Sequence, residues 1–217
     1  MNVALIDYRA GNLTSVRKAL GAVGVDVYTP ERASDLARAD GIVVPGVGHF
    51  NVTAALDEPW RAAVRAHVDR GRPLLGICLG LQWLFEGSEE APDLPGLGLL
   101  RGRCHLIEAR DLKVPHVGWN TLEPTPSRGD AQALRGVPPH AYAYFTHSYV
   151  APVTEACVAT TTHGETFAAV VERDHVMGVQ FHPEKSGDVG LAILRNFVAL
   201  GTGAATDAPV ANREEVR

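Results

Sequence analysis

The first part of the chain alternates short apolar runs with longer segments of helical spacing. Apolar runs typical of strands lie at residues 3–6, 26–29, 41–44 and 74–77. Helices are expected after them, at 13–23, 31–38, 51–68 (with a break near Pro59) and 79–86. Continuous apolar strands that alternate with helices are typical of a parallel sheet covered on both faces.

The pattern changes beyond residue 98. Strand-like runs follow one another there, at 104–109, 142–150, 157–162, 167–172 and 176–181. Turn residues between some of these runs indicate antiparallel hairpins. A last helix is predicted at 189–200, and residues 201–217 lack periodicity, so we expect a disordered tail there. The sequence thus predicts one α/β domain over residues 1–200 with a β-rich second half.

Composition narrows the possible functions. The chain has 217 residues, a formal net charge of -5 and 6% aromatic residues, which disfavours nucleic acid as a partner. No apolar run approaches the roughly 20 residues that a membrane span needs, and no secretory signal is recognisable. The widely spaced Cys78, Cys104 and Cys157 fit neither a disulfide framework nor a metal site, and the histidines lack ligand spacing. We expect a cytoplasmic protein without metal or cofactor.

One cysteine lies in a pattern typical of a nucleophile. Gly76-Ile77-Cys78-Leu79-Gly80 follows an apolar strand and precedes a predicted helix, as in a nucleophile elbow with cysteine in place of serine. The sharp turn strains the backbone, and side chains two positions away on either side would collide, which explains the glycines. Backbone N–H groups at the turn can stabilise a thiolate and a developing oxyanion. A buried structural cysteine beside two incidental glycines is the alternative.

A histidine and a carboxylate complete a candidate triad. His182 and Glu184 lie two residues apart at the end of a predicted strand, so both side chains are expected on the same side. The carboxylate can then orient the imidazole toward a thiol. The alternative is an exposed histidine beside an unrelated glutamate, but the elbow at Cys78 supports the same mechanism independently.

The loop Pro45-Gly46-Val47-Gly48 follows the predicted strand at 41–44. Ligands bind at the carboxyl ends of strands in open α/β sheets, and the glycines permit close backbone approach. The backbone N–H of Val47 or Gly48 is therefore a candidate oxyanion donor. An ordinary strand-to-helix turn is the alternative, and a phosphate loop is disfavoured because no Gly-Lys-Ser/Thr follows.

Several segments together resemble a known family. They are 7–12 (DYRAGN), 45–48 (PGVG), 76–82 (GICLGLQ), 85–90 (FEGSEE), 113–120 (KVPHVGWN), 144–149 (YFTHSY) and 178–186 (GVQFHPEKS). Over about residues 3–200 the chain resembles class I (triad) glutamine amidotransferases, and in particular the glutaminase subunits of imidazole glycerol phosphate synthases. Arg9 stands where that family commonly has glycine. Leu81 stands where it commonly has methionine and where relatives in other pathways usually have histidine.

The resemblance implies a fold and a reaction. The fold is a three-layer α/β domain with a central mixed, mostly parallel sheet flanked by helices and an added antiparallel portion. The reaction is hydrolysis of glutamine to glutamate and ammonia through a thioester. The ammonia passes to a TIM-barrel cyclase subunit in a heterodimer, which forms imidazole glycerol phosphate and aminoimidazole carboxamide ribonucleotide in histidine biosynthesis. Alternatives are the glutaminase of another class I amidotransferase, a stand-alone γ-glutamyl hydrolase or peptidase, and a non-catalytic regulatory partner.

The resemblance also gives each candidate residue a role. Cys78 attacks the amide, His182 transfers protons and Glu184 orients His182. The remaining candidates are Leu79, Val47 and Gly48 as oxyanion donors, Gly46, Gln82, His147, Ser148 and Tyr149 for substrate, and Asn12, Ser15, Trp119, Tyr144 and Lys185 facing the cyclase. A surface position for Gln82, an ordinary strand end at 147–149 and a core position for Trp119 remain open. We hypothesise that one flipped peptide in 45–48 keeps the enzyme inactive until the cyclase binds its substrate.

Overall fold

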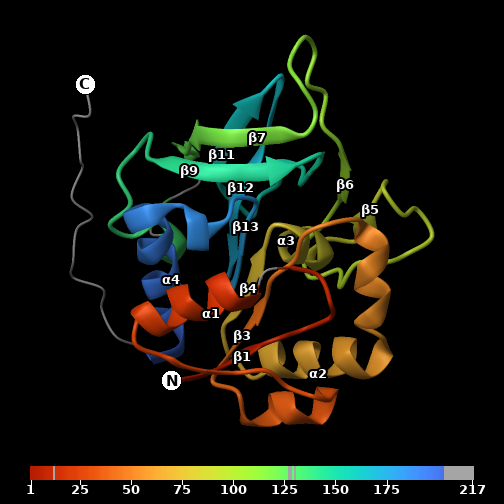
Figure 1. Cartoon of the computed structure of the whole chain (residues 1–217), viewed down its shortest axis with the longest axis vertical. Coiled ribbons are helices and arrows are strands. Elements are labelled where there is room, and N and C mark those ends of the chain that lie inside the picture. The colour runs from red at the N-terminus through yellow and green to blue at the C-terminus, as the bar shows by residue number, and fades with distance from the viewer. Residues whose placement is uncertain (12, 127–128, 130, 203–217) are drawn as a thin grey trace.

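A mixed sheet forms the centre of the molecule (Figure 1). The computed structural model describes residues 1–11, 13–126, 129 and 131–202. In this part of the chain the central sheet has eight strands in the order β2-β1-β3-β4-β13-β12-β11-β8. The parallel strands are β2 (Asp26–Tyr28), β1 (Asn2–Leu5), β3 (Gly41–Val44), β4 (Leu74–Ile77) and β13 (Val176–Val179). The antiparallel strands are β12 (Glu165–Arg173), β11 (Cys157–His163) and β8 (Glu123–Pro124).

Helices cover both faces of this sheet (Figure 1). On one face, α1 (Leu13–Ala22) and α4 (Gly187–Thr202) pack into one hydrophobic cluster. On the other, α2 (Glu58–Asp69), α3 (Leu79–Leu84) and the 3₁₀ helices η1 (Ala33–Arg38) and η2 (Phe50–Ala55) pack into a second cluster. Short 3₁₀ turns follow at η4 (Gln132–Leu134) and η5 (Pro183–Lys185). The predicted three-layer α/β class is confirmed.

The strand β1 shows why the apolar runs are continuous. Val3 and Leu5 belong to the first hydrophobic cluster, whereas Ala4 belongs to the second. Successive side chains of a strand point to opposite faces, and both faces of this sheet are covered by helices. Val3, Ala4 and Leu5 are therefore all buried and apolar, although they point to alternate faces.

Two small sheets extend the β-rich half. One has the order β10-β6-β5, from β10 (Tyr149–Val150), β6 (Arg103–Leu106) and β5 (Gly87–Ser88). The other pairs β7 (His116–Thr121) with β9 (Tyr142–His147) in antiparallel register. The ribbon β7–β9 lies across one end of β11 and β12 (Figure 1). It thereby adds an antiparallel layer beside the carboxyl ends of the parallel strands.

Some boundaries differ from the sequence prediction. The strand β7 was not predicted, because its Gly118, Asn120 and half-buried pattern give no strong apolar alternation. The run 142–150 is two strands, β9 and β10, separated at Ser148. Pro59 lies in the first turn of α2, where its missing N–H costs nothing, so the break precedes it.

The end of the domain also differs. The helix α4 extends to Thr202, so residues 201 and 202 belong to a helix and not to the predicted tail. Residues 203–217 lie outside the described part of the chain. The boundary was misplaced because Gly201 interrupts the apolar periodicity without ending the helix.

Arg9 adopts a conformation that normally favours glycine. It follows β1 with a φ of 63°, and its backbone N–H donates to Asp7 Oδ1 over 2.8 Å. A left-handed conformation costs an L-residue roughly 1–2 kcal/mol, which explains why the resembling family commonly has glycine there. The loop keeps its turn in spite of the substitution.

Buried neutral histidines make the folded state sensitive to acid. His67 is 1% exposed and its Nε2 lies 3.1 Å from the Pro73 carbonyl, and burial lowers its pKa to about 4. In the unfolded chain a histidine has a pKa of about 6.5, so below that pH the unfolded state binds a proton that folded His67 does not. The folded state therefore loses stability relative to the unfolded state as the pH falls from 6.5 toward 4.

We therefore expect the free energy of unfolding to fall between pH 7.5 and pH 5. In His67→Gln, which keeps a donor for Pro73 but does not titrate, the fall should be about 2 kcal/mol smaller. Urea unfolding followed by circular dichroism at both pH values measures this difference. An equal loss in parent and variant would contradict the assignment to His67.

Candidate active site

The chain turns sharply at Cys78, between β4 and α3. Cys78 has a φ of 53°, in the left-handed region. A Cβ on Gly76 would lie 2.7 Å from the backbone of Gly80, and a Cβ on Gly80 would overlap the Val44 carbonyl. Both glycines are therefore required by close backbone packing. The turn places the cysteine at the carboxyl end of a central strand, where open α/β sheets bind ligands.

The thiol of Cys78 lies in a narrow polar setting. Its Sγ is 3.8 Å from the Thr146 carbonyl oxygen and 3.7 Å from Gln180 Nε2. The backbone N–H of Cys78 donates to the Val179 carbonyl over 2.8 Å, which continues the pairing of β4 with β13. The strand β13 therefore fixes the backbone of this residue, and Thr146 and Gln180 flank its side chain.

His182 and Glu184 form a buried pair beside this thiol. His182 Nδ1 lies 2.9 Å from Glu184 Oε1, and both side chains are nearly inaccessible. Burial lowers the pKa of His182, but hydrogen bonding and charge from Cys78 and Glu184 outweigh this and raise it to about 9. Within the described residues, Nε2 has no hydrogen bond of normal geometry. It is therefore the ring nitrogen left to serve the thiol, and such contacts often tighten only when substrate binds.

The backbone that carries this pair is not the expected strand. The strand β13 ends at Val179, and Glu184 lies in the 3₁₀ turn η5. The backbone N–H of His182 donates to the Tyr144 carbonyl over 2.9 Å, and Ser186 Oγ donates to the His182 carbonyl over 2.7 Å. These bonds hold the turn so that the carboxylate meets the imidazole without an extended segment.

The loop 45–48 lies against the elbow in a closed arrangement. The backbone N–H of Leu79, an expected oxyanion donor, donates to the Gly46 carbonyl over 3.3 Å. Val47 is 42% exposed, and Gly48 has a φ of 96° with no atom within 4 Å of an added Cβ. The expected donors are therefore adjacent, but the Leu79 N–H is occupied by a carbonyl of the loop.

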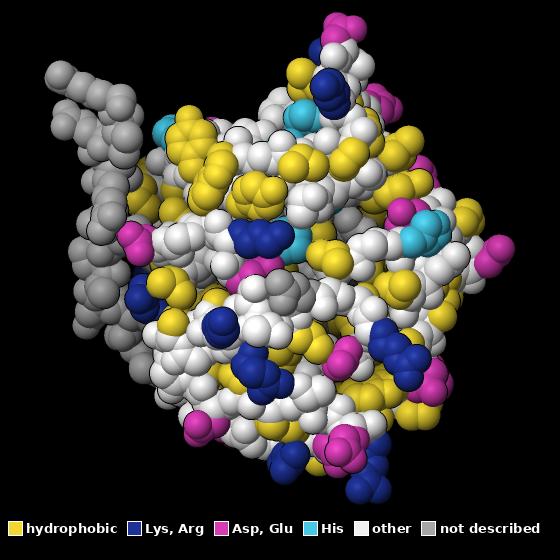
Figure 2. Space-filling view, in the orientation of Figure 1, with side chains coloured by type: hydrophobic (Ala, Val, Ile, Leu, Met, Phe, Trp, Pro, Cys, Tyr) yellow, Lys and Arg dark blue, Asp and Glu magenta, His cyan; other side chains and the backbone are white. Residues whose placement is uncertain are grey.

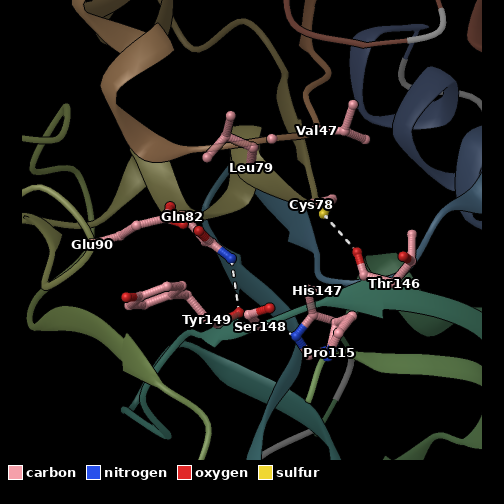
Figure 3. A pocket seen from close by; sticks show the side chains of 11 residues that line it. Val47, Cys78, Leu79, Gln82, Glu90, Pro115, Thr146, His147, Ser148 and Tyr149 are labelled. Atoms are coloured by element: carbon pink, nitrogen blue, oxygen red, sulfur yellow. Dashed lines mark hydrogen bonds between the residues drawn. The ribbon is translucent and has the colours of Figure 1, made fainter.

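A pocket opens on Cys78 (Figure 3). This pocket, called the Cys78 pocket below, has a volume of about 250 Å³. It is lined by Val47, Gly48, Cys78, Leu79, Gln82, Glu90, Pro115, Thr146, His147, Ser148 and Tyr149. Gln82 Nε2 donates to the Tyr149 carbonyl over 2.9 Å, across the pocket wall. All the expected substrate-binding residues except Gly46 line this pocket.

Glu90 lines the pocket although sequence reasoning did not assign it a role. Its Oε2 accepts a hydrogen bond from the Phe50 backbone N–H over 2.7 Å, so it joins the pocket wall to the start of η2. The signal was the acidic run 85–90, which counted only toward the family resemblance. Only the fold shows that this carboxylate, unlike the exposed Glu89, points into the pocket.

A chain of buried hydrogen bonds supports the far wall. His147 Nδ1 lies 3.1 Å from the Tyr149 carbonyl, His147 Nε2 3.1 Å from His116 Nδ1, and Asn120 Nδ2 3.3 Å from His116 Nε2. Burial lowers the pKa of His147 to about 3 and that of His116 to about 4. Both rings are therefore neutral at physiological pH. Because the carbonyl accepts from Nδ1–H of His147, each ring donates from Nδ1 and accepts at Nε2.

The expected cyclase-facing residues fall into three groups. Trp119 on β7 is 57% exposed, and its ring meets that of Tyr144 on β9 at 5.9 Å, edge to face. Lys185 Nζ lies 5.4 Å from the centre of the Tyr144 ring. Ser15 lies on α1 and lines a separate hollow, and Asn12 lies outside the described residues. Figure 2 shows hydrophobic side chains gathered over the β7–β9 ribbon, where Val117 and Tyr142 are also exposed.

The described residues contain no group of three His, Cys, Asp or Glu side chains that could hold a metal ion. In the same residues, no helix is long and apolar enough to cross a membrane.

The elbow predicts opposite effects for two glycine substitutions. Gly80→Ala should lower the free energy of unfolding by about 3 kcal/mol or prevent folding, because overpacking against Val44 must move backbone. Gly21→Ala, in α1 with open space around it, should raise it by about 0.5–1 kcal/mol. Thermal and urea unfolding of both variants measures the contrast. A fully stable Gly80→Ala protein would show that the elbow tolerates a side chain.

Comparisons with known proteins place this site in a family. The family model described as Glutamine amidotransferase class-I matches residues 4–200. The imidazole glycerol phosphate synthase subunit HisH of Deinococcus radiodurans is 48% identical, covering 90% of this chain and 92% of that protein. The HisH subunit of Thermococcus kodakarensis is 44% identical, covering 91% of this chain and all (100%) of that protein.

Solved structures show the same fold at low identity. A structure titled glutamine amidotransferase has a TM-score of 0.71 at 19% identity, covering 92% of this chain and 98% of its own. The glutaminase domain of Trypanosoma brucei CTPS has a TM-score of 0.70 at 15% identity, covering 98% of both chains. The chain therefore belongs to the class-I glutamine amidotransferase family, among the HisH subunits of imidazole glycerol phosphate synthase.

Proposed function

We propose that this chain is the glutaminase subunit of an imidazole glycerol phosphate synthase. It hydrolyses glutamine to glutamate and ammonia, and a cyclase subunit uses the ammonia in histidine biosynthesis. The observation that carries this proposal is the Cys78 thiol at a sharp turn beside the His182–Glu184 pair, with a pocket opening on it. The HisH relatives supply the pathway.

The triad performs the hydrolysis in two steps. The Cys78 sulfur attacks the side-chain amide carbon of glutamine, and His182 gives a proton to the departing ammonia. The raised pKa of His182 keeps it protonated for this step at neutral pH. His182 then takes a proton from water, which hydrolyses the γ-glutamyl thioester. Glu184 fixes the ring so that Nε2 faces the reacting atoms.

The oxyanion of both steps needs backbone donors. Leu79 and Val47 or Gly48 are the donors we propose, but the Leu79 N–H now serves the Gly46 carbonyl. Rotation of the Gly46–Val47 peptide would release the Leu79 N–H and turn the Val47 N–H toward the oxyanion. We propose that the cyclase subunit, with its own substrate bound, favours this rotated state. The chain alone would then be nearly inactive.

Substrate glutamine fits the Cys78 pocket by charge and shape. Glu90 provides a carboxylate for the α-ammonium group of the substrate. The Nε2 of Gln82 already donates to the Tyr149 carbonyl, so Gln82 offers the substrate its Oε1 as a hydrogen-bond acceptor. Ser148 and His147 line the same pocket, and Gly46 holds the loop against Leu79, the residue after the cysteine. These contacts would place the side-chain amide at Cys78.

Ammonia needs a shielded exit, because ammonium is not a nucleophile. A hollow of about 120 Å³ lies beyond the loop and is lined by Gly11, Val16, Pro45, Gly46, Val47, Ile77, His182, Glu184 and Lys185. It borders His182 and Glu184 of the triad as well as Lys185, which lies over the Tyr144 ring. We propose that the face around Trp119, Tyr144 and Lys185, together with Ser15 on α1, binds the cyclase barrel in a heterodimer. The expected role of Asn12 falls outside the described residues.

Two further observations support this assignment. A protein of Emericella nidulans named imidazole glycerol phosphate synthase hisHF is 40% identical to 90% of this chain, which covers 37% of that longer protein. We infer that the cyclase function occupies the rest of it. A catalytic thiol also requires reducing surroundings, and we therefore place the enzyme in the cytoplasm.

A stand-alone γ-glutamyl hydrolase or peptidase is the competing function. Such an enzyme needs an open oxyanion site without a partner, whereas here the Leu79 N–H is occupied. The glutaminase of another class I amidotransferase is disfavoured by the 48% and 44% identity to HisH subunits. A non-catalytic partner is disfavoured because Cys78, His182 and Glu184 are all present and the His182–Glu184 pair is formed.

The first test of the proposal is glutamate release from glutamine. The pure chain, the chain with the cyclase subunit, and the complex with the cyclase nucleotide substrate are compared, with Cys78→Ala as the control. We expect glutamate release by the liganded complex to be roughly 10²–10³ times faster than release by the chain alone, which is the rate effect of one oxyanion donor. Full activity of the chain alone would contradict the gated loop and the pathway, but not the triad chemistry.

The role of Glu90 is tested by a matched pair of variants in the liganded complex. Glu90→Gln keeps an acceptor for the Phe50 N–H but removes the charge, so KM for glutamine should rise about tenfold or more with little change in kcat. The exposed neighbour variant Glu89→Gln should leave both unchanged. An unchanged KM in Glu90→Gln would remove Glu90 from the substrate site.

A further inference from the structure

The Tyr8 hydroxyl is buried without a hydrogen-bond partner among the described residues. Tyr8 follows β1, is 5% exposed, and its oxygen is inaccessible to water. Buried hydroxyl groups are nearly always hydrogen-bonded, because an unmade bond in the interior costs free energy. An orphaned hydroxyl near an active site therefore calls for a partner that another state of the protein provides.

The hydroxyl lies directly beside the loop that must move. A Cβ on Gly46 would overlap the Tyr8 oxygen. Gly11 lies on the turn after β1, as Tyr8 does, and a Cβ on Gly11 would lie 3.6 Å from Gly46 Cα and 3.7 Å from the Val47 nitrogen. The turn after β1 thus contacts the Gly46–Val47 peptide through both Tyr8 and Gly11. Tyr8 and Gly11, from a segment that is conspicuous in the sequence, therefore lie next to the loop 45–48.

The peptide has a reason to rotate and the space to do so. The bond from the Leu79 N–H to the Gly46 carbonyl is long, at 3.3 Å. Val47 lines both the Cys78 pocket, of about 250 Å³, and the hollow of about 120 Å³ near Lys185. Gly46 is itself buried, so its carbonyl needs a new donor when it leaves Leu79.

We propose that the Tyr8 hydroxyl is this second donor. When the peptide rotates, the hydroxyl donates a hydrogen bond to the Gly46 carbonyl and so stabilises the catalytic orientation of the loop. The inference rests on the proposed glutaminase function. Tyr8 does not contact glutamine in this account. It is a positioning residue that acts through the Gly46–Val47 peptide. Its hydrogen bond in the rotated state replaces the one that the Leu79 N–H makes to Gly46 in the closed state.

The hydroxyl keeps its proton in either state. Burial raises the pKa of Tyr8 above its ordinary value, and the charge of the nearby Cys78 raises it further. Tyr8 is therefore a hydrogen-bond donor throughout the pH range in which the enzyme works. A carbonyl oxygen, which only accepts, is the complementary group.

The test is Tyr8→Phe in the complex with the cyclase subunit and its nucleotide substrate. Loss of one neutral hydrogen bond from the active state should lower the kcat for glutamate release by about three- to tenfold, with KM for glutamine unchanged. The unfolding midpoint of the free chain should stay equal or rise, because in the closed state the hydroxyl has no hydrogen-bond partner within the described part of the chain. An unchanged kcat would overturn the proposal. A loss of kcat accompanied by a lower unfolding midpoint would also overturn it.

Tyr28→Phe is the matched control. The Tyr28 hydroxyl donates to the Asp35 carbonyl over 2.8 Å, away from the active site. Its removal should lower the unfolding midpoint and leave kcat unchanged, the reverse of the pattern for Tyr8. Replacement of Tyr8 by 4-aminophenylalanine, which restores a donor at the same position, should recover most of the lost kcat. Failure of this rescue would also contradict a donor role.

Hydrogen exchange of the Leu79 amide separates this inference from the proposed function. In the free chain, rotation of the peptide exposes that amide to the Cys78 pocket. Tyr8→Phe removes the donor that stabilises the rotated state, so the rotated state should be populated less. Exchange of the Leu79 amide, measured by NMR, should therefore slow about three- to tenfold. If no combination of subunits shows glutaminase activity, the proposed function fails and exchange alone decides. Unchanged exchange overturns the role of Tyr8 whatever the activity.

Discussion

The site depends on the close approach of backbone segments around Cys78. Gly76 and Gly80 leave no room for a Cβ, and Gly80 packs directly on the Val44 carbonyl. This packing joins three elements, β3, β4 and α3, at one point and forces Cys78 into a left-handed conformation. The thiol therefore projects beyond the sheet, at the edge where the carboxyl ends of the parallel strands meet.

The same close packing makes the loop 45–48 part of the active site. Its Gly46 contacts Leu79 on one side and Tyr8 on the other. In the proposed mechanism, the Gly46 carbonyl that occupies the Leu79 N–H blocks the oxyanion position without moving any catalytic side chain. One peptide plane would then control activity, while the His182–Glu184 pair stays buried and in contact.

The antiparallel half of the chain contributes an exposed aromatic surface and one wall of the Cys78 pocket. The ribbon β7–β9 carries the exposed Trp119 outside and the buried His116–His147 pair inside. His147 contacts the carbonyl of Tyr149, which lines the Cys78 pocket. The exposed aromatic surface that we propose for the cyclase and the buried pair behind the pocket wall are thus two sides of one two-stranded ribbon.

The sequence by itself determined the α/β class, the elbow at Cys78 and the family, because these depend on local periodicity, glycine spacing and contiguous motifs. It misplaced the end of α4 and missed β7, whose Gly118 breaks the strand pattern. Only the tertiary structure brought Glu90 into the pocket, seated Tyr8 beside Gly46 and showed the Leu79 N–H occupied. Such contacts join residues more than thirty positions apart, and their geometry follows from packing and not from any local pattern.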